Sequence, residues 1–369
     1  MENKTVVEYV WIDGNNCLRG KTRVLNERIK STDKENLPLI PNWNYDGSST
    51  GQAKGTDSEV TIIPRALFYN PFLKDGLLVM CDTYDSQGVP LPSNTRYFAN
   101  EIFNKNLDEK PWFGLEQEYF IQDNGFEDIV KFSQPQGKYY CGVGNGNAIY
   151  RKIAELHLKH CISAGVNIAG INAEVAPQQW EYQIGICEGI DAGDHLWMAR
   201  YLLERIGEEY YVNINLSPKP LKGDWNGSGC HTNYSTENMR NGTDNKTGLD
   251  YINEAISRLS KTHEEHMKVY GSGNEERMTG EYETADFNKF SDGIANRGAS
   301  VRRGHDTIKN KKGYFEDRRP SSNCDPYLVT SIIFKTTYLH NEMPKNSKAF
   351  ICECGKEYNT LPDNPIAGI

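Results

Sequence analysis

The most constraining feature of the sequence is the segment Trp112-Phe113-Gly114-Leu115-Glu116-Gln117-Glu118-Tyr119-Phe120. Its aromatic and aliphatic residues predict a β-strand over Trp112–Gln122. Residues two apart on a strand point to the same face, so Glu116 and Glu118 project together. Two carboxylates this close repel each other unless a cation lies between them or one is protonated. The fold must therefore leave this face to water, as an exposed strand with solvated glutamates, or bring a cation to it.

A second pair of carboxylates lies in Ala173-Glu174-Val175-Ala176-Pro177-Gln178-Gln179-Trp180-Glu181. Pro177 interrupts any continuous strand and favours a tight turn. A turn symmetric about Pro177–Gln178 predicts that Glu174 and Glu181 face each other across a hairpin, about 5 Å apart. Like charges in direct opposition are destabilising, and a divalent cation relieves the repulsion. Mg²⁺ and Mn²⁺ prefer hard oxygen ligands, so the sequence predicts one of them here.

The chain has 369 residues, of which 37% are hydrophobic and 25% are charged, as in ordinary globular proteins. Its net charge of -9 argues against a broad nucleic-acid-binding surface, which would need to be basic. We find no apolar run of membrane-spanning length and no signal peptide, and we expect no membrane partner. The nine cysteines are scattered, which suits reduced thiols and predicts a cytoplasmic protein.

The predicted secondary structure changes within Asn94–Phe103 from mostly strands to a mixture of helices and strands. This change predicts domains at residues 1–98 and 99–369. The first is expected to be small and mostly β, and the second to be α+β, with helices on one side of a sheet. The predicted helices are Tyr150–Ala164, Asp194–Glu209 with Asp194 as N-cap, and Leu249–Tyr270. The predicted strands are Thr5–Asp13, Thr22–Leu25, Glu59–Ile63, Leu77–Cys81, Trp112–Gln122, Val166–Val175, Trp180–Ile186, Tyr211–Leu216, His231–Tyr234 and Tyr314–Arg318.

Several other motifs have an ordinary structural interpretation when each is taken alone. His231 is then a hydrogen-bonded core histidine, and Glu316–Arg319 is a solvated salt-bridge patch. His263-Glu264-Glu265-His266 misses the H-E-x-x-H zinc pattern, because its histidines are three residues apart, and we interpret it as the solvated face of the third helix. Gly142-x-Gly144-x-Gly146 lacks dinucleotide-binding spacing, and no Walker A motif occurs. Any ATP site is therefore not a P-loop.

Together, and in this order, these segments resemble glutamine synthetases of the eukaryotic type. The similarity runs from about residue 5 to about residue 340, and six motifs in one order are far more specific than any one of them. The segments that carry the resemblance are Trp43–Thr50, Gly114–Tyr119, Asn172–Glu181, Asn226–Ser235, Asn296–Arg302 and Lys312–Pro320.

The resemblance implies an N-terminal β-grasp domain followed by a larger catalytic domain with an antiparallel sheet and flanking helices. It also implies a homodecamer of two pentameric rings, with active sites between subunits. The implied activity is ATP-dependent ligation of ammonium to L-glutamate, through γ-glutamyl phosphate, with at least two Mg²⁺ or Mn²⁺ ions per site.

The same resemblance implies roles for individual residues. One metal ion would be held by Glu118, Glu174 and Glu181, and the other by Glu116, His231 and Glu316. Glutamate would be bound by Arg277, Arg318, Asn226 and Gly227. The transferring and ATP phosphates would contact Arg297 and Arg302, and the nucleotide would lie along Asn233, Ser235 and Tyr314.

Two further catalytic roles follow from the resemblance. Asp46 of the neighbouring subunit would accept a proton from ammonium. Glu283 would lie on a flap that shields the acyl phosphate from water, because hydrolysis would waste ATP.

The sequence departs from the family pattern at a few positions that are not mapped ligands: Lys138, Ile186, Ser217 and Arg303-Gly304-His305. These departures affect the expected geometry of loops and leave the implied site intact. Three alternatives remain open at this point. They are a γ-glutamyl ligase for a larger amine, a catalytically silent structural relative, and a metallohydrolase that uses the same carboxylates.

Overall fold

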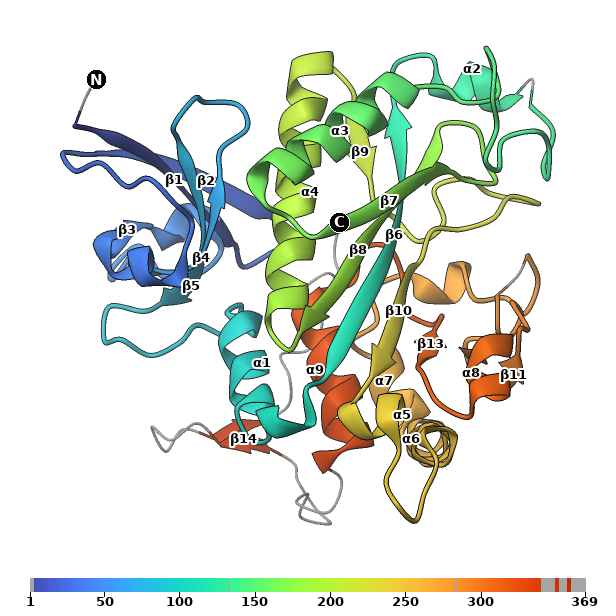
Figure 1. The fold of residues 1–369 in the computed structure, drawn as a ribbon. Coiled ribbons are helices and arrows are strands. Elements are labelled where there is room, and N and C mark those ends of the chain that lie inside the picture. The colour runs from blue at the N-terminus through green and yellow to red at the C-terminus, as the bar shows by residue number, and fades with distance from the viewer. Residues whose placement is uncertain (1–2, 132, 283, 340–348, 352–356, 360–369) are drawn as a thin grey trace. The chain divides into compact units, whose positions relative to one another are not determined.

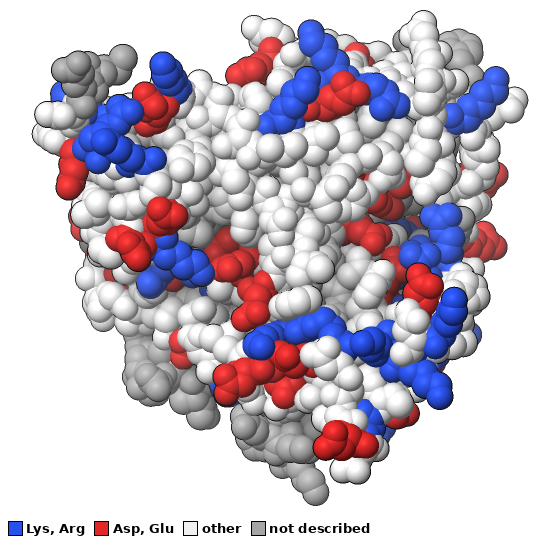
Figure 2. Space-filling view, in the orientation of Figure 1, with Lys and Arg blue, Asp and Glu red and all other residues white. Residues whose placement is uncertain are grey.

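A computed structural model describes residues 3–131, 133–282, 284–339, 349–351 and 357–359 (Figure 1). The chain divides into two compact units. The first contains the described residues of Met1–Phe98, His160–Val166 and Met343–Ile369, and the second those of Ala99–Lys159 and Asn167–Glu342. Acidic and basic side chains are interspersed on the face drawn in Figure 2. None of the helices in the described ranges is long and apolar enough to cross a membrane.

The first unit contains a five-stranded sheet in the order β2-β1-β5-β4-β3. Its strands are β1 (Thr5–Ile12), β2 (Leu18–Leu25), β3 (Trp43–Asp46), β4 (Glu59–Tyr69) and β5 (Leu77–Tyr84), with the short 3-10 helices η1 (Lys34–Leu39) and η2 (Gly47–Thr50). The central strands β1 and β5 pair in parallel, and the other pairs are antiparallel. Val7, Tyr9 and Trp11 alternate along β1 and fill the core of this unit.

The second unit contains an eight-stranded sheet in the order β11-β12-β13-β10-β6-β8-β7, with β9 beside β6. Its pairs are antiparallel except for β11 and β12. The predicted α+β class is confirmed. The strands are β6 (Trp112–Gln122), β7 (Ile168–Ala173), β8 (Gln179–Glu188), β9 (Asn213–Asn215), β10 (Cys230–Ser235), β11 (Asp292–Ile294), β12 (Val301–Arg303) and β13 (Phe315–Asp317).

The α-helices of the described residues are numbered α1 to α9 along the chain. Helix α4 packs on β6, β8 and α9. Their bounds are α1 (Thr95–Phe103), η3 (Leu107–Glu109), α2 (Phe126–Lys131), α3 (Arg151–Ala164), α4 (Asp191–Tyr210), α5 (Glu237–Asn241), α6 (Gly248–Lys261), α7 (His263–Met267), η4 (Asn274–Glu276), α8 (His305–Asn310) and α9 (Pro326–Thr337). The short strands β14 (Ala349–Ile351) and β15 (Glu357–Asn359) form a separate pair.

The start of α4 differs from the prediction. The helix begins at Asp191, so Asp194 lies inside it and is not the N-cap. Asp194 is buried, and its Oδ1 accepts a hydrogen bond of 2.6 Å from the hydroxyl of Tyr327 on α9. Gly193 makes this approach possible, because a Cβ atom there would lie 2.3 Å from the Tyr327 ring. A partner distant in the sequence therefore decides the role of this aspartate.

The predicted helix over Leu249–Tyr270 is two helices. Helix α6 starts with a capping box between Thr247 and Asp250, and Thr262, with φ of -118°, separates it from α7. His263 and His266 are buried, so their predicted solvated position was wrong. His266 Nδ1 lies 2.6 Å from the Tyr270 hydroxyl, and its Nε2 lies 2.9 Å from Thr336 Oγ1. The two histidines belong to the core and not to a metal-binding group of the described residues.

A fully buried ion pair lies behind β13. Arg319 Nη2 is 2.7 Å from Asp317 Oδ2, and neither side chain is accessible to solvent. The Tyr270 hydroxyl donates a hydrogen bond of 2.7 Å to the same oxygen. Side chains alternate along a strand, so Asp317 and Arg319 point to one face of β13, and Glu316 and Arg318 point to the other. The buried ion pair therefore holds the strand in the orientation that places Glu316 and Arg318 on the opposite face.

We expect Asp317→Asn to lower the free energy of unfolding by about 3–5 kcal/mol, because it leaves a buried guanidinium without a counter-ion. Asp292→Asn is the matched control, since Asp292 pairs with Arg303 at the surface, where such a pair contributes about 0–1 kcal/mol. Denaturant unfolding of both variants measures the difference. Equal losses would contradict the structural role of the buried pair.

Candidate functional site

The site is built on the pairing of β6 with its two neighbours. On one side Glu116 lies opposite His231 of β10, and on the other Glu118 lies opposite Glu181 of β8. Glu116 and Glu118 share a face of β6, so this register gathers ionisable side chains from three strands on one face of the sheet. Two groups result, each with ligand atoms that all lie within 4.8 Å of one another.

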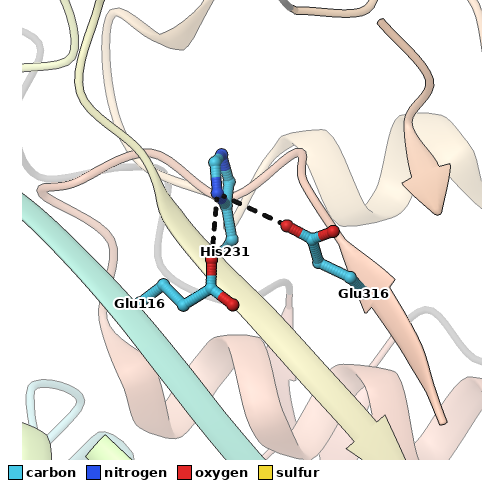
Figure 3. A group of neighbouring side chains, drawn as sticks. All are labelled: Glu116, His231 and Glu316. Carbon is cyan, nitrogen blue, oxygen red and sulfur yellow. Dashed lines mark ion pairs between the residues drawn. The ribbon is translucent and has the colours of Figure 1, made fainter. Parts of the chain in front are cut away.

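The Glu116 group consists of Glu116, His231 and Glu316, from β6, β10 and β13 (Figure 3). The imidazole lies between the two carboxylates, with Nδ1 3.6 Å from Glu116 Oε2 and 3.5 Å from Glu316 Oε1. Burial, together with the charge of Arg318, holds the pKa of His231 well below its usual value of 6.5. The ring is therefore neutral near pH 7, which is the form that binds a metal ion.

The Glu118 group consists of Glu118, Glu174 and Glu181. Burial and the repulsion of a neighbouring glutamate in the group raise the pKa of each carboxyl to about 8. Hard oxygen ligands and one neutral imidazole, in two adjacent groups, are the donor set that suits Mg²⁺ or Mn²⁺. A divalent cation in each group would offset the repulsion, so the residues fit the predicted metal ions.

Polar neighbours orient the carboxylates of the Glu118 group. The amide of Gly229 donates a hydrogen bond of 2.7 Å to Glu118 Oε2. Asn172 Nδ2 lies 2.9 Å from Glu174 Oε1, and the Gln183 amide contacts Glu181. Neither Asn172 nor Gln183 was predicted from the sequence as a site residue. Each lies two residues from a glutamate of this group, and that spacing on a strand could have indicated them.

Glu174 and Glu181 are not directly opposed, so the predicted register of this hairpin was wrong by two residues. Glu181 pairs with Asn172, and the amide of Glu174 donates to the carbonyl of Gln179 at 2.8 Å. The turn closes early because Gln178 adopts a left-handed conformation, with φ of 63°. Glu174 still reaches the group, because it directly follows the end of β7.

Two arginines flank Glu316. Arg318 Nη1 donates a hydrogen bond of 2.8 Å to Glu316 Oε1, and Arg302 Nε forms an ion pair with Oε2. Arg318 Nε also donates to the backbone carbonyl of Arg297 at 3.0 Å, which ties the exposed Arg297 segment to β13. Two of the arginines predicted to bind phosphate or glutamate, Arg302 and Arg318, therefore contact the Glu116 group, and the backbone of a third, Arg297, contacts Arg318.

Arg277 is buried and has several backbone partners. Its Nη2 lies within hydrogen-bonding distance of the carbonyls of Arg318, Arg319 and Pro320, and its Nε donates to Asn274 at 3.0 Å. Burial lowers its pKa to about 10. This arginine holds the segment that carries Arg318, a role that the sequence analysis did not predict.

The other residues predicted to contact glutamate lie next to this arginine or in the same loop. A Cβ atom at Gly227 would lie 2.4 Å from Arg277 Cγ, so only glycine fits there. The carbonyl of Gly227 accepts a hydrogen bond of 3.1 Å from Gln179. The side chain of Asn226 is mostly buried and accepts a hydrogen bond from Gln136.

The three residues predicted to line the nucleotide differ in their contacts and in their exposure to solvent. Asn233 Nδ2 donates to Glu116 Oε1 at 2.8 Å, so it touches the Glu116 group. Ser235 is buried, and its Oγ accepts a hydrogen bond of 2.9 Å from Arg240. Tyr314 is exposed.

The two remaining predicted residues are Asp46 and Glu283. Asp46 is on the first unit, where it is the N-cap of η2 and its Oδ1 accepts hydrogen bonds from the amide and hydroxyl of Ser48 at 3.0 and 2.6 Å. These hydrogen bonds lower its pKa below 3.8. Glu283 lies outside the described residues.

The chain is similar to known proteins over most of its length. Residues 95–339 match the family described as glutamine synthetase, catalytic domain. A putative glutamine synthetase of Acanthamoeba polyphaga mimivirus is 54% identical over 90% of this chain and 94% of its own length. Glutamine synthetase of Candida glabrata is 48% identical over 96% and 94%, and a nodule isozyme from Lupinus luteus is 52% identical over 91% and 95%.

The fold matches solved structures as well. A glutamine synthetase from Plasmodium falciparum superimposes with a TM-score of 0.72, at 16% sequence identity, over 93% of this chain and 75% of that one. This similarity concerns the fold alone, whereas the relatives that are about half identical cover nearly the full length of both chains. The matched catalytic domain and these relatives show that the chain belongs to the glutamine synthetase family.

Proposed function

We propose that the chain is an ATP-dependent glutamate–ammonia ligase, which forms L-glutamine, ADP and phosphate through γ-glutamyl phosphate. The observation that supports this most strongly is the pair of largely buried ligand groups with Arg302 and Arg318 against Glu316. Cationic side chains beside a metal-binding group suit phosphoryl transfer, in which charge on the transferred group must be stabilised. A metallohydrolase would not require this set of arginines.

The proposed metal ions are Mg²⁺ or Mn²⁺, one in the Glu116 group and one in the Glu118 group. When bound, such ions would supply positive charge that offsets the negative charge of the phosphates. The chain's own residues supply the remaining functions. Asn172, Gln183 and Gly229 orient the carboxylates, and the neutral ring of His231 offers its nitrogen lone pair.

The other assignments complete the proposed reaction. Arg297 and Arg302 contact the phosphates, and Asn233, Ser235 and Tyr314 line the nucleotide. Glutamate is bound by Arg318, Asn226, Gly227 and Arg277. Arg277 would bind glutamate in addition to its protein acceptors, because its Nε already donates to Asn274 and its Nη2 to the carbonyl of Arg319. Asp46 accepts the ammonium proton, for which its ionised state is suited, and Glu283 shields the acyl phosphate.

We further propose that residues 1–98 and 99–369 are separate domains and that the protein is a cytoplasmic homodecamer. Asp46 belongs to a different compact unit from the two ligand groups, which is compatible with a site completed by a neighbouring subunit. The free cysteines of the described residues suit a reducing compartment.

The test of the proposed function measures both products in one reaction with Mg²⁺, ATP and L-glutamate. We expect glutamine and ADP to form in a ratio close to one, and both to depend on added ammonium. Glutamate labelled with ¹⁸O in its side-chain carboxylate should pass one label to phosphate, because that oxygen attacks the γ-phosphorus. Methylamine in place of ammonium tests for a larger acceptor. ADP release without labelled phosphate would contradict the proposal.

The variant Glu181→Gln tests the metal-binding role of Glu181 separately from its effect on the stability of the metal-free protein. The raised pKa values mean that the metal-free protein loses stability as pH rises from about 4.5 through 8, where these carboxyls ionise against one another. We expect the metal-free variant to melt a few degrees above wild type at pH 8.5, because one charge is gone. We also expect Mn²⁺ to raise its melting temperature much less than that of wild type.

Glu188→Gln is the matched control, since Glu188 is an exposed residue of the same strand and should change neither quantity. Equal stabilisation of Glu181→Gln and wild type by Mn²⁺ would remove Glu181 from the metal site.

A further inference from the structure

Arg200 of α4 is a buried cation whose described partners include no carboxylate. It is 2% exposed. Its Nε and Nη2 donate to Gln117 Oε1 at 2.9 and 2.7 Å, and its Nη2 and Nη1 donate to the carbonyls of Ser322 and Cys324 at 2.9 and 2.8 Å. A buried guanidinium is normally paired with an acid, because removing its charge from water is costly. Here the hydrogen bonds to neutral acceptors and the Trp197 ring, whose centroid is 4.7 Å from Arg200 Cζ, take the place of a carboxylate.

The acceptors of Arg200 lead directly to Glu118. Gln117 lies between Glu116 and Glu118, so its side chain projects from the opposite face of β6. With its carbonyl oxygen fixed by Arg200, its Nε2 donates to the backbone carbonyl of Glu118 at 2.9 Å and to Ser322 Oγ at 2.8 Å. The Ser322 hydroxyl donates to the same Glu118 carbonyl at 2.5 Å. Two of the three residues that Arg200 binds therefore hold the peptide group of Glu118.

The other side of Glu118 is fixed as well. Its amide donates to the carbonyl of Gly229 at 3.0 Å, and its Oε2 accepts from the amide of Gly229. The amide of Ser322 donates to the carbonyl of Ser228 at 3.1 Å, so the Ser322 segment also holds the loop that leads into Gly229. Arg200 thus lies at the centre of the contacts that set the position of Glu118 relative to Glu174 and Glu181.

We propose that Arg200 is a positioning residue for the metal-binding site: through Gln117 and Ser322 it fixes Glu118, and it thereby raises the affinity of the Glu118 group for a divalent cation. The inference rests on the proposed function, because it assumes that this group binds metal. The planar fork of arginine is essential to it, since one side chain must reach acceptors on β6 and on the Ser322–Cys324 segment at once. Lysine keeps the charge and loses the fork.

The test isolates each ligand group with a second substitution and measures Mn²⁺ binding directly. Glu316→Gln disables the Glu116 group and leaves the Glu118 group, whereas Glu118→Gln does the reverse. We expect Arg200→Lys to weaken Mn²⁺ binding about 10- to 100-fold in the Glu316→Gln protein, as for other residues that orient metal ligands. In the Glu118→Gln protein it should leave the affinity unchanged. Isothermal titration and Mn²⁺ electron paramagnetic resonance give the readout without turnover.

Arg205→Lys is the matched control, because Arg205 lies on the same helix and pairs with Glu208 at the surface. Ser322→Ala is the second variant, and it alone decides the question if Arg200→Lys does not fold. It removes the hydroxyl donated to Glu118 and should weaken the same group selectively, by a smaller factor.

Three results would overturn the inference. One is unchanged Mn²⁺ affinity of the Glu118 group in Arg200→Lys and Ser322→Ala, even with a lower melting temperature. Another is equal weakening of both groups, which would indicate a general effect on the fold. The third is absence of Mn²⁺ binding in both the Glu316→Gln and the Glu118→Gln protein when neither carries a further substitution. In that case the proposed metal sites themselves fail, and the inference fails with them.

Discussion

Repulsion between buried carboxylates is the constraint on which this structure depends. Glu118, Glu174 and Glu181 lie within one small, largely buried volume, and burial together with the charge of a neighbouring glutamate raises the pKa of each. A fold that places them there loses stability when they are charged, and a bound cation restores it. The arrangement is hard to explain as a structural core, and it is well explained as a metal site.

Two strands serve the site and the core at once. On β6, Glu116 and Glu118 face the site, and Gln117 between them faces Arg200. On β13 and the two residues beyond it, Glu316 and Arg318 face the site, whereas Asp317 and Arg319 form a buried ion pair. Because alternation couples the two faces, a shift of one residue in either strand would exchange ligands for core residues. The buried polar contacts on one face of the sheet therefore maintain the positions of the candidate metal ligands on the other face.

The sequence alone predicted what depends on local spacing. The i, i+2 pattern of Glu116 and Glu118 and the turn at Pro177 led to the strands and to the idea of a cation. Adding His231 and Glu316 required resemblance to a family, because nothing local distinguishes a ligand histidine from a core histidine. The register of the β7–β8 hairpin was missed, since it depends on the left-handed conformation of Gln178.

Long-range partners account for the other differences. Asp194 accepts a hydrogen bond from Tyr327, and Nε2 of His266 lies beside Thr336, and neither partner is implied by neighbouring residues. The backbone contacts of Arg277 and the contacts of Arg200 became evident only when loops distant in sequence were placed together.

The most direct test of the two proposed metal sites is anomalous scattering from crystals grown with Mn²⁺, ADP and a glutamate analogue, with data collected at the manganese absorption edge. We expect one peak among Glu116, His231 and Glu316 and a second among Glu118, Glu174 and Glu181. We also expect Glu181→Gln crystals grown in the same way to lose the second peak and keep the first. Absence of a peak from either group in the wild-type protein, or persistence of the second peak in the variant, would contradict the two-metal assignment.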